Sequence, residues 1–221
     1  MLTLETRGPV TVAHLDDGKA NAVGHAFLDA AHQALDAAAE TSALVFVGRE
    51  GVFSAGFDLK ELQKGPSERE ALVGRGAHFL HRLFTHPQPV VAAATGHAIA
   101  AGALILLASD TRVGARGDFK VGLNETAIDM ALPVFGLELA KARLDPRQLT
   151  AAVTQATIYD IDRATEVGYL DELVDPDAVL ERAVEIATGL AELPAGAYAA
   201  NKMGVRQDFA EVIAASLPPS E

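Results

Sequence analysis

Cysteine and tryptophan are both absent from this chain of 221 residues, and aromatic side chains make up only 5% of it. The absence of thiols excludes disulfides, thiolate nucleophiles and cysteine-ligated metals. It also fits a reducing compartment, and we expect the protein to be cytoplasmic. Because few aromatic rings are available, aliphatic side chains must fill the core, and apolar residues in total make up 49% of the chain.

Positive charge is scarce. Lysine and arginine number 18 against 30 aspartates and glutamates, which gives a net charge of −12. A surface of this sign repels nucleic acids and anionic membranes, so we expect neither as a partner. No apolar run approaches the roughly 18 residues that a membrane-spanning helix needs, and the first seven residues lack the basic and apolar parts of a signal peptide. The seven histidines show no paired spacing with a third ligand, so we predict no metal site.

Apolar runs alternate with amphipathic segments along the first two thirds of the chain. Pro87 and Pro89 stop one of the amphipathic segments. Strand and helix in alternation predict an α/β architecture with parallel strand pairing. Strand-like runs occupy residues 2–4, 10–15, 43–48 and 90–94, and helical periodicity occupies residues 24–40, 67–86 and 104–108.

Beyond Asp145 and Pro146 the pattern changes. We therefore predict two regions, a core at 1–145 and a helical region at 146–221. A chain of this length can bury one large core, so the second region is expected to be an appendage of the first. Helical periodicity in it covers residues 146–155, 162–168, 177–193 and 195–215.

The junction after the strand at 43–48 is rich in small residues. Residues 51–62 read Gly-Val-Phe-Ser-Ala-Gly-Phe-Asp-Leu-Lys-Glu-Leu, with three small residues directly before the expected helix. Such a junction leaves backbone N–H groups free to face an anionic oxygen, which is the physical requirement of an oxyanion hole. A second stretch of small residues, Ala98–Ala103, follows the strand at 90–94.

Two familiar motifs nearly match this chain and fail. A nucleophile elbow around Ser54 needs glycine where Val52 stands, so we interpret Ser54 as a spacer and not as a nucleophile. A dinucleotide-binding motif that begins at Gly74 needs glycine where Phe79 stands. Serine hydrolysis and dinucleotide binding are therefore disfavoured.

Glu125 lies in a largely apolar segment, residues 121–132. Local sequence alone favours a helix cap or a solvated helix charge, because unpaired charges are seldom buried. The alternative is a desolvated carboxylate with a raised pKa, which suits a group that transfers protons. Asp110 is interpreted as a structural turn residue. Asp129 and Glu138 are interpreted as solvated charges, either of which can act as a second acid.

Two signatures resemble those of the crotonase, or enoyl-CoA hydratase/isomerase, superfamily. They are residues 52–60 and residues 96–104, which continue into 109–113, with residues 19–22 upstream. The resemblance covers at least residues 10–145, while the helical region fits less closely and is shorter than usual. It implies a crotonase-like spiral of ββα units whose helical C-terminal region closes the pocket and builds homotrimers, which can pair into hexamers. It also implies an acyl-CoA thioester as ligand, with coenzyme A as part of the substrate and no separate cofactor.

In this family two backbone amides stabilise a thioester enolate, and the resemblance assigns them to Phe57 and Ala101. Ala101 stands where glycine is common, but its amide is kept. The residues that the resemblance assigns to substrate binding are Lys19, Ala20, Ala22, Ser54, Ala55, Asp58, Leu59, Gly102 and Leu104. Candidates for holding the CoA phosphates are Arg49, Lys60, Lys64, Lys202 and Arg206.

Carboxylates distinguish the family's reactions. Hydratases use two of them to activate a water, at the positions of Leu104 and Glu125 in this chain. With Leu104 apolar, the sequence looks most like the Δ3-Δ2-enoyl-CoA isomerases, in which Glu125 would carry a proton from C2 to C4. Three alternatives stay open: an enoyl-CoA hydratase of fatty acid β-oxidation that recruits another acid, a non-catalytic acyl-CoA-binding trimer, and thioester hydrolysis or another enolate reaction.

Overall fold

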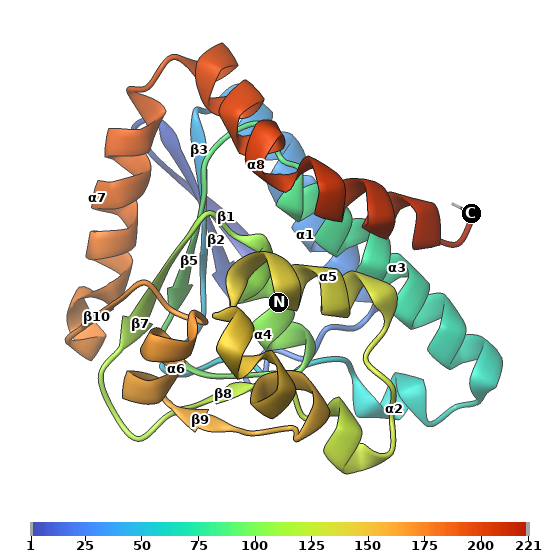
Figure 1. Ribbon diagram of the computed structural model, residues 1–221. Helices are drawn as coiled ribbons and strands as arrows, with labels where there is room; N and C mark the ends of the chain where they lie inside the picture. Colours follow the sequence, from blue (N-terminus) through green and yellow to red (C-terminus); the bar gives the residue numbers. More distant parts are fainter. Residues whose placement is uncertain (1, 220–221) are drawn as a thin grey trace.

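The strands form two sheets, and from the third to the eighth strand the chain alternates between them (Figure 1). The computed structural model of the protein describes residues 2–219. The larger sheet has the order β1 (Leu2–Arg7), β2 (Val10–Leu15), β3 (Ala43–Val47), β5 (Val90–Ala94), β7 (Thr111–Ala115) and β10 (Glu172–Val174). The smaller sheet has the order β4 (Gly51–Ser54), β6 (Gly96–Ile99), β8 (Lys120–Gly122) and β9 (Tyr159–Asp160).

The middle of the chain is a spiral of repeated units, each with one strand in each sheet followed by a helix. β3, β5 and β7 pair in parallel, and so do β4, β6 and β8, which confirms the predicted α/β architecture. Each small-residue junction begins with a short strand of the smaller sheet, which the sequence did not reveal. The helical parts of the three units are α2 (Leu59–Leu62) with α3 (Pro66–Phe84), α4 (Ala101–Ala108), and a 3-10 helix (Glu125–Ile128) with α5 (Val134–Arg143).

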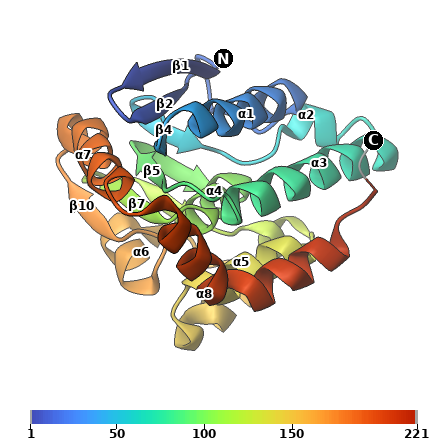
Figure 2. The same ribbon diagram turned by 90° about the horizontal axis from the view of Figure 1, so that it is seen from above.

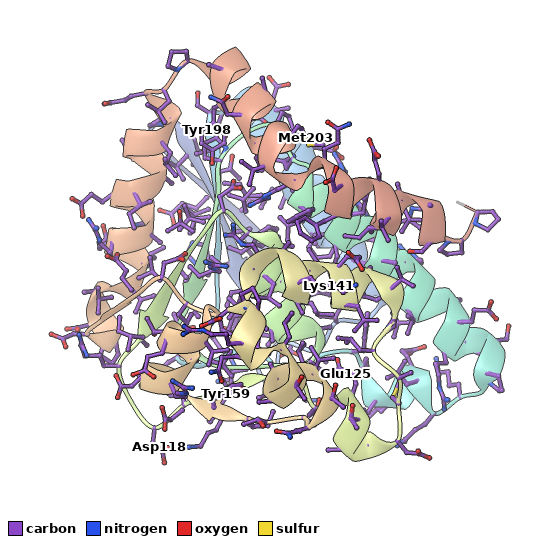
Figure 3. The ribbon with its side chains drawn as sticks, viewed as in Figure 1. Asp118, Glu125, Lys141, Tyr159, Tyr198 and Met203 are labelled. Carbon is purple, nitrogen blue, oxygen red and sulfur yellow. The ribbon has the colours of Figure 1, made fainter. Side chains whose placement is uncertain are left out.

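The larger sheet is buried on both faces, which is why its central strands are apolar throughout. Alternate side chains, among them Val45, Val91 and Val113, pack with α7 (Val179–Ala191) on one face. The other face packs with α1 (His25–Ala37), α3 and α4 to form the main core. Figure 2 shows α7 on one side of the sheet and these helices on the other, and Figure 3 shows side chains filling the space between them.

Local signals fix the helix ends. Pro66 begins α3, where its missing N–H costs nothing, and Asp58 caps α2 by accepting a hydrogen bond from the Lys60 amide at 2.8 Å. Gly168, with φ of +106°, ends α6 (Ile161–Val167) in the left-handed conformation that favours glycine. None of the helices in residues 2–219 is long and apolar enough to cross a membrane.

The expectation that residues 146–221 are purely helical is wrong. Two strands lie in this region: β10 pairs in parallel with β7, and β9 pairs antiparallel with β8, so both sheets of the core extend into it. Strands of two or three residues are too short to produce a visible alternation of apolar and polar residues. The expected helices near 162–168, 177–193 and 195–215 are found as α6, α7 and α8 (Ala195–Ser216), and residues 146–155 form a 3-10 turn and a π-helical turn.

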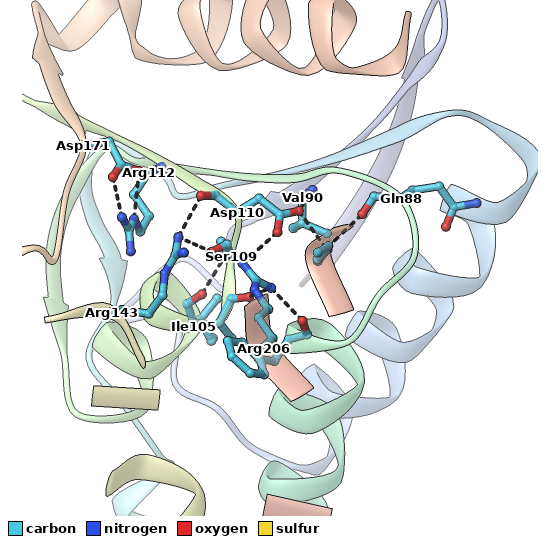
Figure 4. A network of polar contacts seen from close by, with 12 residues as sticks. Gln88, Val90, Ile105, Ser109, Asp110, Arg112, Arg143, Asp171 and Arg206 are labelled. Carbon is cyan, nitrogen blue, oxygen red and sulfur yellow. Dashed lines mark hydrogen bonds and ion pairs between the residues drawn. The ribbon is translucent and has the colours of Figure 1, made fainter. Parts of the chain in front are cut away.

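Asp110 is the centre of a buried ionic cluster that joins α8 to the core (Figure 4). Its carboxylate accepts hydrogen bonds from Lys202 Nζ and from the Val90 amide, both at 2.7 Å, and pairs with Arg206 at 2.8 Å. The two cations expose only 5% and 6% of their side-chain surface. The interpretation of Asp110 as a structural residue is confirmed, and the prediction that Lys202 and Arg206 bind CoA phosphates is wrong.

Other donors of this cluster satisfy backbone carbonyls at two helix ends. Arg206 donates to Phe84 O at the end of α3 (2.6 Å) and to Ala108 O at the end of α4 (3.3 Å). Arg143 donates to the carbonyl of Ser109 at 2.9 Å. The last carbonyls of a helix have no partner within it, and cations are stabilised at this negative end of the helix dipole. These carbonyls help to stabilise three cations beside the single carboxylate of Asp110. Burial nevertheless lowers the pKa of Lys202 to about 8.

Asp110→Asn is expected to reduce the free energy of unfolding by about 3–5 kcal/mol, because it leaves Lys202 and Arg206 buried without a counter-charge. Urea unfolding followed by circular dichroism measures the change. The matched control is Asp36→Asn, since Asp36 makes an exposed pair with Arg82 and such pairs contribute at most about 1 kcal/mol. Equal effects of the two substitutions would contradict the structural role of the cluster.

Candidate active site

Three parallel strands of the smaller sheet end at one edge, and the residues that follow them meet there. β6 pairs in parallel with β4 on one side and with β8 on the other. Parallel strands present their carboxyl ends at the same edge of a sheet. Phe57, Ala101 and Glu125 each stand two or three residues beyond one of these ends, so the topology brings together the three residues predicted to be catalytic.

The first turn presents the backbone amide of Phe57. The Val23 amide donates to Gly56 O at 2.8 Å, and the Asp58 amide donates to Val23 O at 3.1 Å, so both neighbours of Phe57 are tied to Val23. The Phe57 amide has no acceptor among residues 2–219. Gly56 gives the turn its shape with φ of +97°, a conformation that side chains disfavour.

The second turn presents the amide of Ala101 at the start of α4. Ala100 before it has φ of +52° and ψ of −122°, a conformation that costs a residue with a Cβ roughly 1–3 kcal/mol. A hydrogen bond of 2.9 Å from the Ala100 amide to Gly122 O holds the turn. The Ala101 amide, among the first of its helix, finds no acceptor in the described chain. A Cβ placed on Gly56 would lie 3.4 Å from the Ala101 nitrogen, so the two turns are in contact.

Ser54 and Gly102 keep the two turns at this distance. A Cβ on Gly102 would overlap the carbonyl of Ser54, so only glycine allows α4 to approach β4 so closely. The Ser54 hydroxyl donates to Asn21 O at 2.7 Å, and Asn21 Nδ2 donates to Phe53 O at 3.1 Å. Ser54 is fully buried, which supports its interpretation as a spacer. Gly102 is buried as well, so these two residues, which the resemblance assigns to substrate binding, set the distance between the two turns.

Glu125 begins the 3-10 helix after β8, and its carboxylate is sheltered from water. Burial raises the pKa of Glu125, while the backbone amides of Glu125 and Asn124 oppose the shift. Its Oε2 atom is buried and has no hydrogen-bond partner. The local interpretation of Glu125 as a solvated helix charge is therefore wrong. A desolvated carboxylate without a counter-ion is suited to accept and return a proton.

No second carboxylate stands at the position that a hydratase uses. Leu104 occupies it and is fully buried in the main core. Glu138 is buried in α5 and pairs with Lys141 at 2.6 Å, so its interpretation as a solvated charge is wrong. Asp129 is exposed and follows the 3-10 helix in the left-handed conformation. Among residues 2–219 no group of three or more His, Asp or Glu side chains could hold a metal ion.

The loop between β2 and α1 lies against the first turn. Ala20 O accepts a hydrogen bond from the Ala55 amide at 2.9 Å, and Lys19 O accepts one from Arg49 Nε at 2.7 Å. A cleft of about 350 Å³ opens beside this loop, and Ala22 and Asp58 are among its lining residues. Of the residues predicted to bind substrate, Ala22 and Asp58 thus line the cleft, while Lys19, Ala20 and Ala55 lie in the hydrogen-bonded loop and turn beside it.

The cations near this cleft differ in whether their side chains already have a polar partner. Arg49 is bound to the Lys19 carbonyl, and Lys64 pairs with Glu61 at 2.7 Å. Lys60 is exposed on α2, beside Leu59, which exposes 61% of its surface. Acidic side chains line the cleft itself, so phosphates are expected to lie outside it, toward α2. The acidic lining residues are Asp16, Asp17, Asp58 and Glu61.

An apolar wall stands beside the two free amides. The ring of Phe57 lies against Gly76 of α3, where a Cβ would come within 2.5 Å of it. The gap between these elements is narrow and leaves no space for a water molecule. α3 and α4 therefore exclude water on this side of the two amides. The residues around the gap are Val23, Phe57, Gly76, Phe79, Leu80, Ala101 and Ile105.

Sequence reasoning did not single out Asn21, Tyr159 or Tyr169. Asn21 has φ of +50° and ties the β2–α1 loop to β4 through its side chain, and a buried asparagine beside small residues is the signal that could have found it. The two tyrosines lie in the region interpreted as helical, and no local pattern marks them. Both are buried, and neither hydroxyl has a hydrogen-bond partner within residues 2–219.

Comparison with known proteins places this geometry in a family. A family model of enoyl-CoA hydratase/isomerase matches residues 5–217. The chain belongs to the enoyl-CoA hydratase/isomerase family. The crotonase-like spiral that the two signatures imply is thereby confirmed, since solved members superpose on nearly the whole chain with TM-scores up to 0.94.

Solved structures of this family carry both reaction names. An apo structure of an enoyl-CoA isomerase from Mycobacterium tuberculosis is 37% identical to the chain, has a TM-score of 0.94 and covers 98% of this chain and 95% of that one. A structure of an enoyl-CoA hydratase from Mycobacterium ulcerans is 36% identical, with a TM-score of 0.94 and coverage of 98% and 96%. Human mitochondrial Δ3-Δ2-enoyl-CoA isomerase, at 22% identity and a TM-score of 0.92, shares the fold and covers 97% and 86%.

Curated relatives in the family are longer than this chain. A probable enoyl-CoA hydratase from Mycobacterium avium is 33% identical over 77% of the chain and 66% of its own length. Another from Mycobacterium tuberculosis is 29% identical over 75% of the chain and 64% of its own length. The family member described here thus spans slightly less than two thirds of these relatives.

Gly102→Ala is expected to destabilise the protein by more than about 1 kcal/mol and to displace the Ala101 amide, because the new Cβ overlaps the Ser54 carbonyl. Gly189→Ala is the matched control, since Gly189 is also helical and has open space around its Cα; it should stabilise the protein by up to about 1 kcal/mol. Thermal unfolding measures both. A neutral Gly102→Ala would contradict the close approach of the two turns.

Proposed function

We propose that the protein is an acyl-CoA enzyme that stabilises a thioester enolate. One observation carries the proposal: two backbone amides that have no acceptor among residues 2–219 lie at the same sheet edge as Glu125, whose buried Oε2 atom has no partner there either. Amides that are already oriented toward a developing oxyanion contribute a few kcal/mol each in a site that excludes water. The Phe57 and Ala101 amides would bind the thioester oxygen, and Glu125 would act on the carbon beside it.

The favoured reaction is the isomerisation of a 3-enoyl-CoA to a 2-enoyl-CoA. Glu125 removes a proton from C2, and the electrons of that C–H bond move to the thioester oxygen, which the two amides hold as the oxyanion of a dienolate. Protonated Glu125 then returns the proton to C4, so the double bond moves from C3–C4 to C2–C3. One carboxylate serves both steps, and the raised pKa of Glu125 brings it nearer to the working pH.

Leu104 supports isomerisation over hydration. Addition of water needs a base and an acid on the two sides of one water molecule, and the buried Leu104 side chain offers neither. The names of the curated relatives favour enoyl-CoA hydration as the second candidate. In that case another acid, such as the exposed Asp129, would have to approach the water.

Coenzyme A would enter as part of the substrate. The β2–α1 loop and the first turn offer backbone groups and the cleft beside Ala22 for its adenine end. Lys60 is then the cation best placed to meet the phosphates, because Arg49 and Lys64 are already paired. The narrow apolar wall of α3 and α4 would line the acyl chain.

Glu125→Gln is expected to lower the rate of 3-hexenoyl-CoA isomerisation by about 10²–10⁴-fold and to leave acyl-CoA affinity nearly unchanged, because the amide keeps the shape but cannot carry the proton. Turnover is followed by the absorbance of the conjugated product, with crotonyl-CoA hydration measured beside it. Glu138→Gln is the control, since Glu138 pairs with Lys141 in α5. Full isomerase activity in Glu125→Gln would overturn the assignment, and faster hydration than isomerisation in the unmodified protein would favour the hydratase.

The homotrimer that the resemblance implies is part of the proposal. α8 and the turn before it leave Leu193, Val205 and Val212 exposed, with 79% of Val205 open to solvent. Sedimentation equilibrium should give about three times the chain mass of 23.1 kDa, and Val205→Glu should weaken the assembly. A monomer at micromolar concentration, or a trimer that Val205→Glu leaves intact, would contradict the role of this surface.

A further inference from the structure

Unpartnered polar atoms gather behind Glu125. Among residues 2–219, eight buried side-chain polar atoms lack a hydrogen-bond partner. Four of the eight belong to the end of the smaller sheet: Asn124 Oδ1, Glu125 Oε2 and the hydroxyls of Tyr159 and Tyr169. An unsatisfied buried polar group costs about 1–3 kcal/mol, so a group of them calls for a physical explanation.

The backbone sets both tyrosines beside the strand that leads to Glu125. Tyr159 in β9 pairs directly with Val121 of β8. Tyr169 follows the end of α6 and is fixed by a 2.8 Å hydrogen bond from its amide to Ala164 O. The two rings lie 5.9 Å apart at 42°. In Figure 3, Tyr159 and Glu125 lie at the same lower end of the molecule, and Tyr198 lies at the opposite end.

The charges around Tyr169 identify it as a donor. Burial raises the pKa of Tyr169 far above its ordinary value, and the charge of Glu125 adds to the shift. Burial also raises the pKa of Tyr159. Both phenols therefore keep their protons at working pH. An ionised Glu125 can only accept hydrogen bonds, so the two kinds of group are complementary.

The four atoms do not hydrogen-bond to one another, so a small group that both donates and accepts can join them. Water is the smallest such group, and buried waters commonly join polar atoms that lack other partners. A water that accepts from a tyrosine hydroxyl keeps both of its own hydrogens to donate. One of these can reach Glu125 Oε2.

We propose that Tyr169 is a positioning residue for Glu125, acting through one ordered water that it shares with Tyr159 and that donates to Glu125 Oε2. The inference rests on the proposed role of Glu125 as the base. The water fixes one carboxylate oxygen and leaves the other for the substrate. It also stabilises the ionised form, which limits how far burial raises the pKa of the base.

Tyr169→Phe tests the inference, because it keeps the ring and removes the hydroxyl that holds the water, and with it the water's hydrogen bond to Glu125. Loss of a hydrogen bond to the ionised carboxylate should raise the pKa of Glu125 by roughly 0.5–1 pH unit. The measurement is the protonated-carboxyl infrared band as a function of pH, taken as the difference between each protein and its Glu125→Gln counterpart. Tyr198→Phe is the matched control, since Tyr198 lies beside Asp110, and it should leave the Glu125 titration unchanged.

The infrared titration needs no turnover, so it separates this inference from the proposed function. A shifted band in a protein that does not isomerise 3-hexenoyl-CoA would support the inference and refute the function. In an active protein, the acidic limb of kcat/KM should move upward in Tyr169→Phe by the same amount, with the rate at high pH nearly unchanged. If Tyr169→Phe does not fold, Tyr159→Phe should give a smaller shift of the same sign. Titrations that coincide with the unmodified protein in the folded variants would overturn the inference.

Discussion

The contact between the two turns that follow β4 and β6 is the constraint on which the site depends. Glycine makes it possible at three levels: Gly96 against the Gly51 backbone, Gly102 against the Ser54 carbonyl, and Gly56 against Ala100. A Cβ at any of these positions would push the strands or α4 apart. The contact lets two amides from distant parts of the chain face the same volume. The small residues of both signatures thus serve spacing, and the chemistry is done by the backbone that they expose.

The rest of the fold holds this contact in place. The larger sheet is covered on both faces, and it sets the positions of the strands that feed the smaller sheet. The Asp110 cluster fastens α8 to the ends of α3 and α4, which carry the apolar wall beside the amides. Ala100 has a strained backbone conformation, and the hydrogen bond from its amide to Gly122 O holds it there. Such strain is expected in a turn whose position is fixed by the surrounding structure. Three of the 18 cations, Arg112, Lys202 and Arg206, are buried and serve the fold.

Much of this could be predicted from the sequence, for physical reasons. β3, β5 and α3 are long or strongly patterned, and prolines mark the end of α3, so their existence followed from periodicity. β9 and β10 are too short for any periodicity, and they were missed. Lys202 and Arg206 were misjudged because a cation on a helix is normally exposed, and only the tertiary fold shows Asp110 beside them.

The candidate site, like the fold, could be predicted from the sequence only in part. The local pattern of small residues before a helix marked the two junctions, and the family resemblance assigned the amides of Phe57 and Ala101 within them. Glu125 could not be assigned locally, since burial of a carboxylate depends on residues far away in the chain, and the family resemblance corrected that interpretation. Tyr159 and Tyr169 gave no signal at all, because their relation to Glu125 arises only when β9 joins β8.

The most direct test of a single base on an enolate is the fate of the proton at C2. 3-Hexenoyl-CoA deuterated at C2 is converted by the protein in ordinary water, and the product is analysed by NMR. The account predicts 2-hexenoyl-CoA that carries part of the deuterium at C4, because Glu125 returns the atom that it removed. A 3-hydroxyacyl-CoA as the main product, or 2-hexenoyl-CoA with no deuterium at C4, would contradict it.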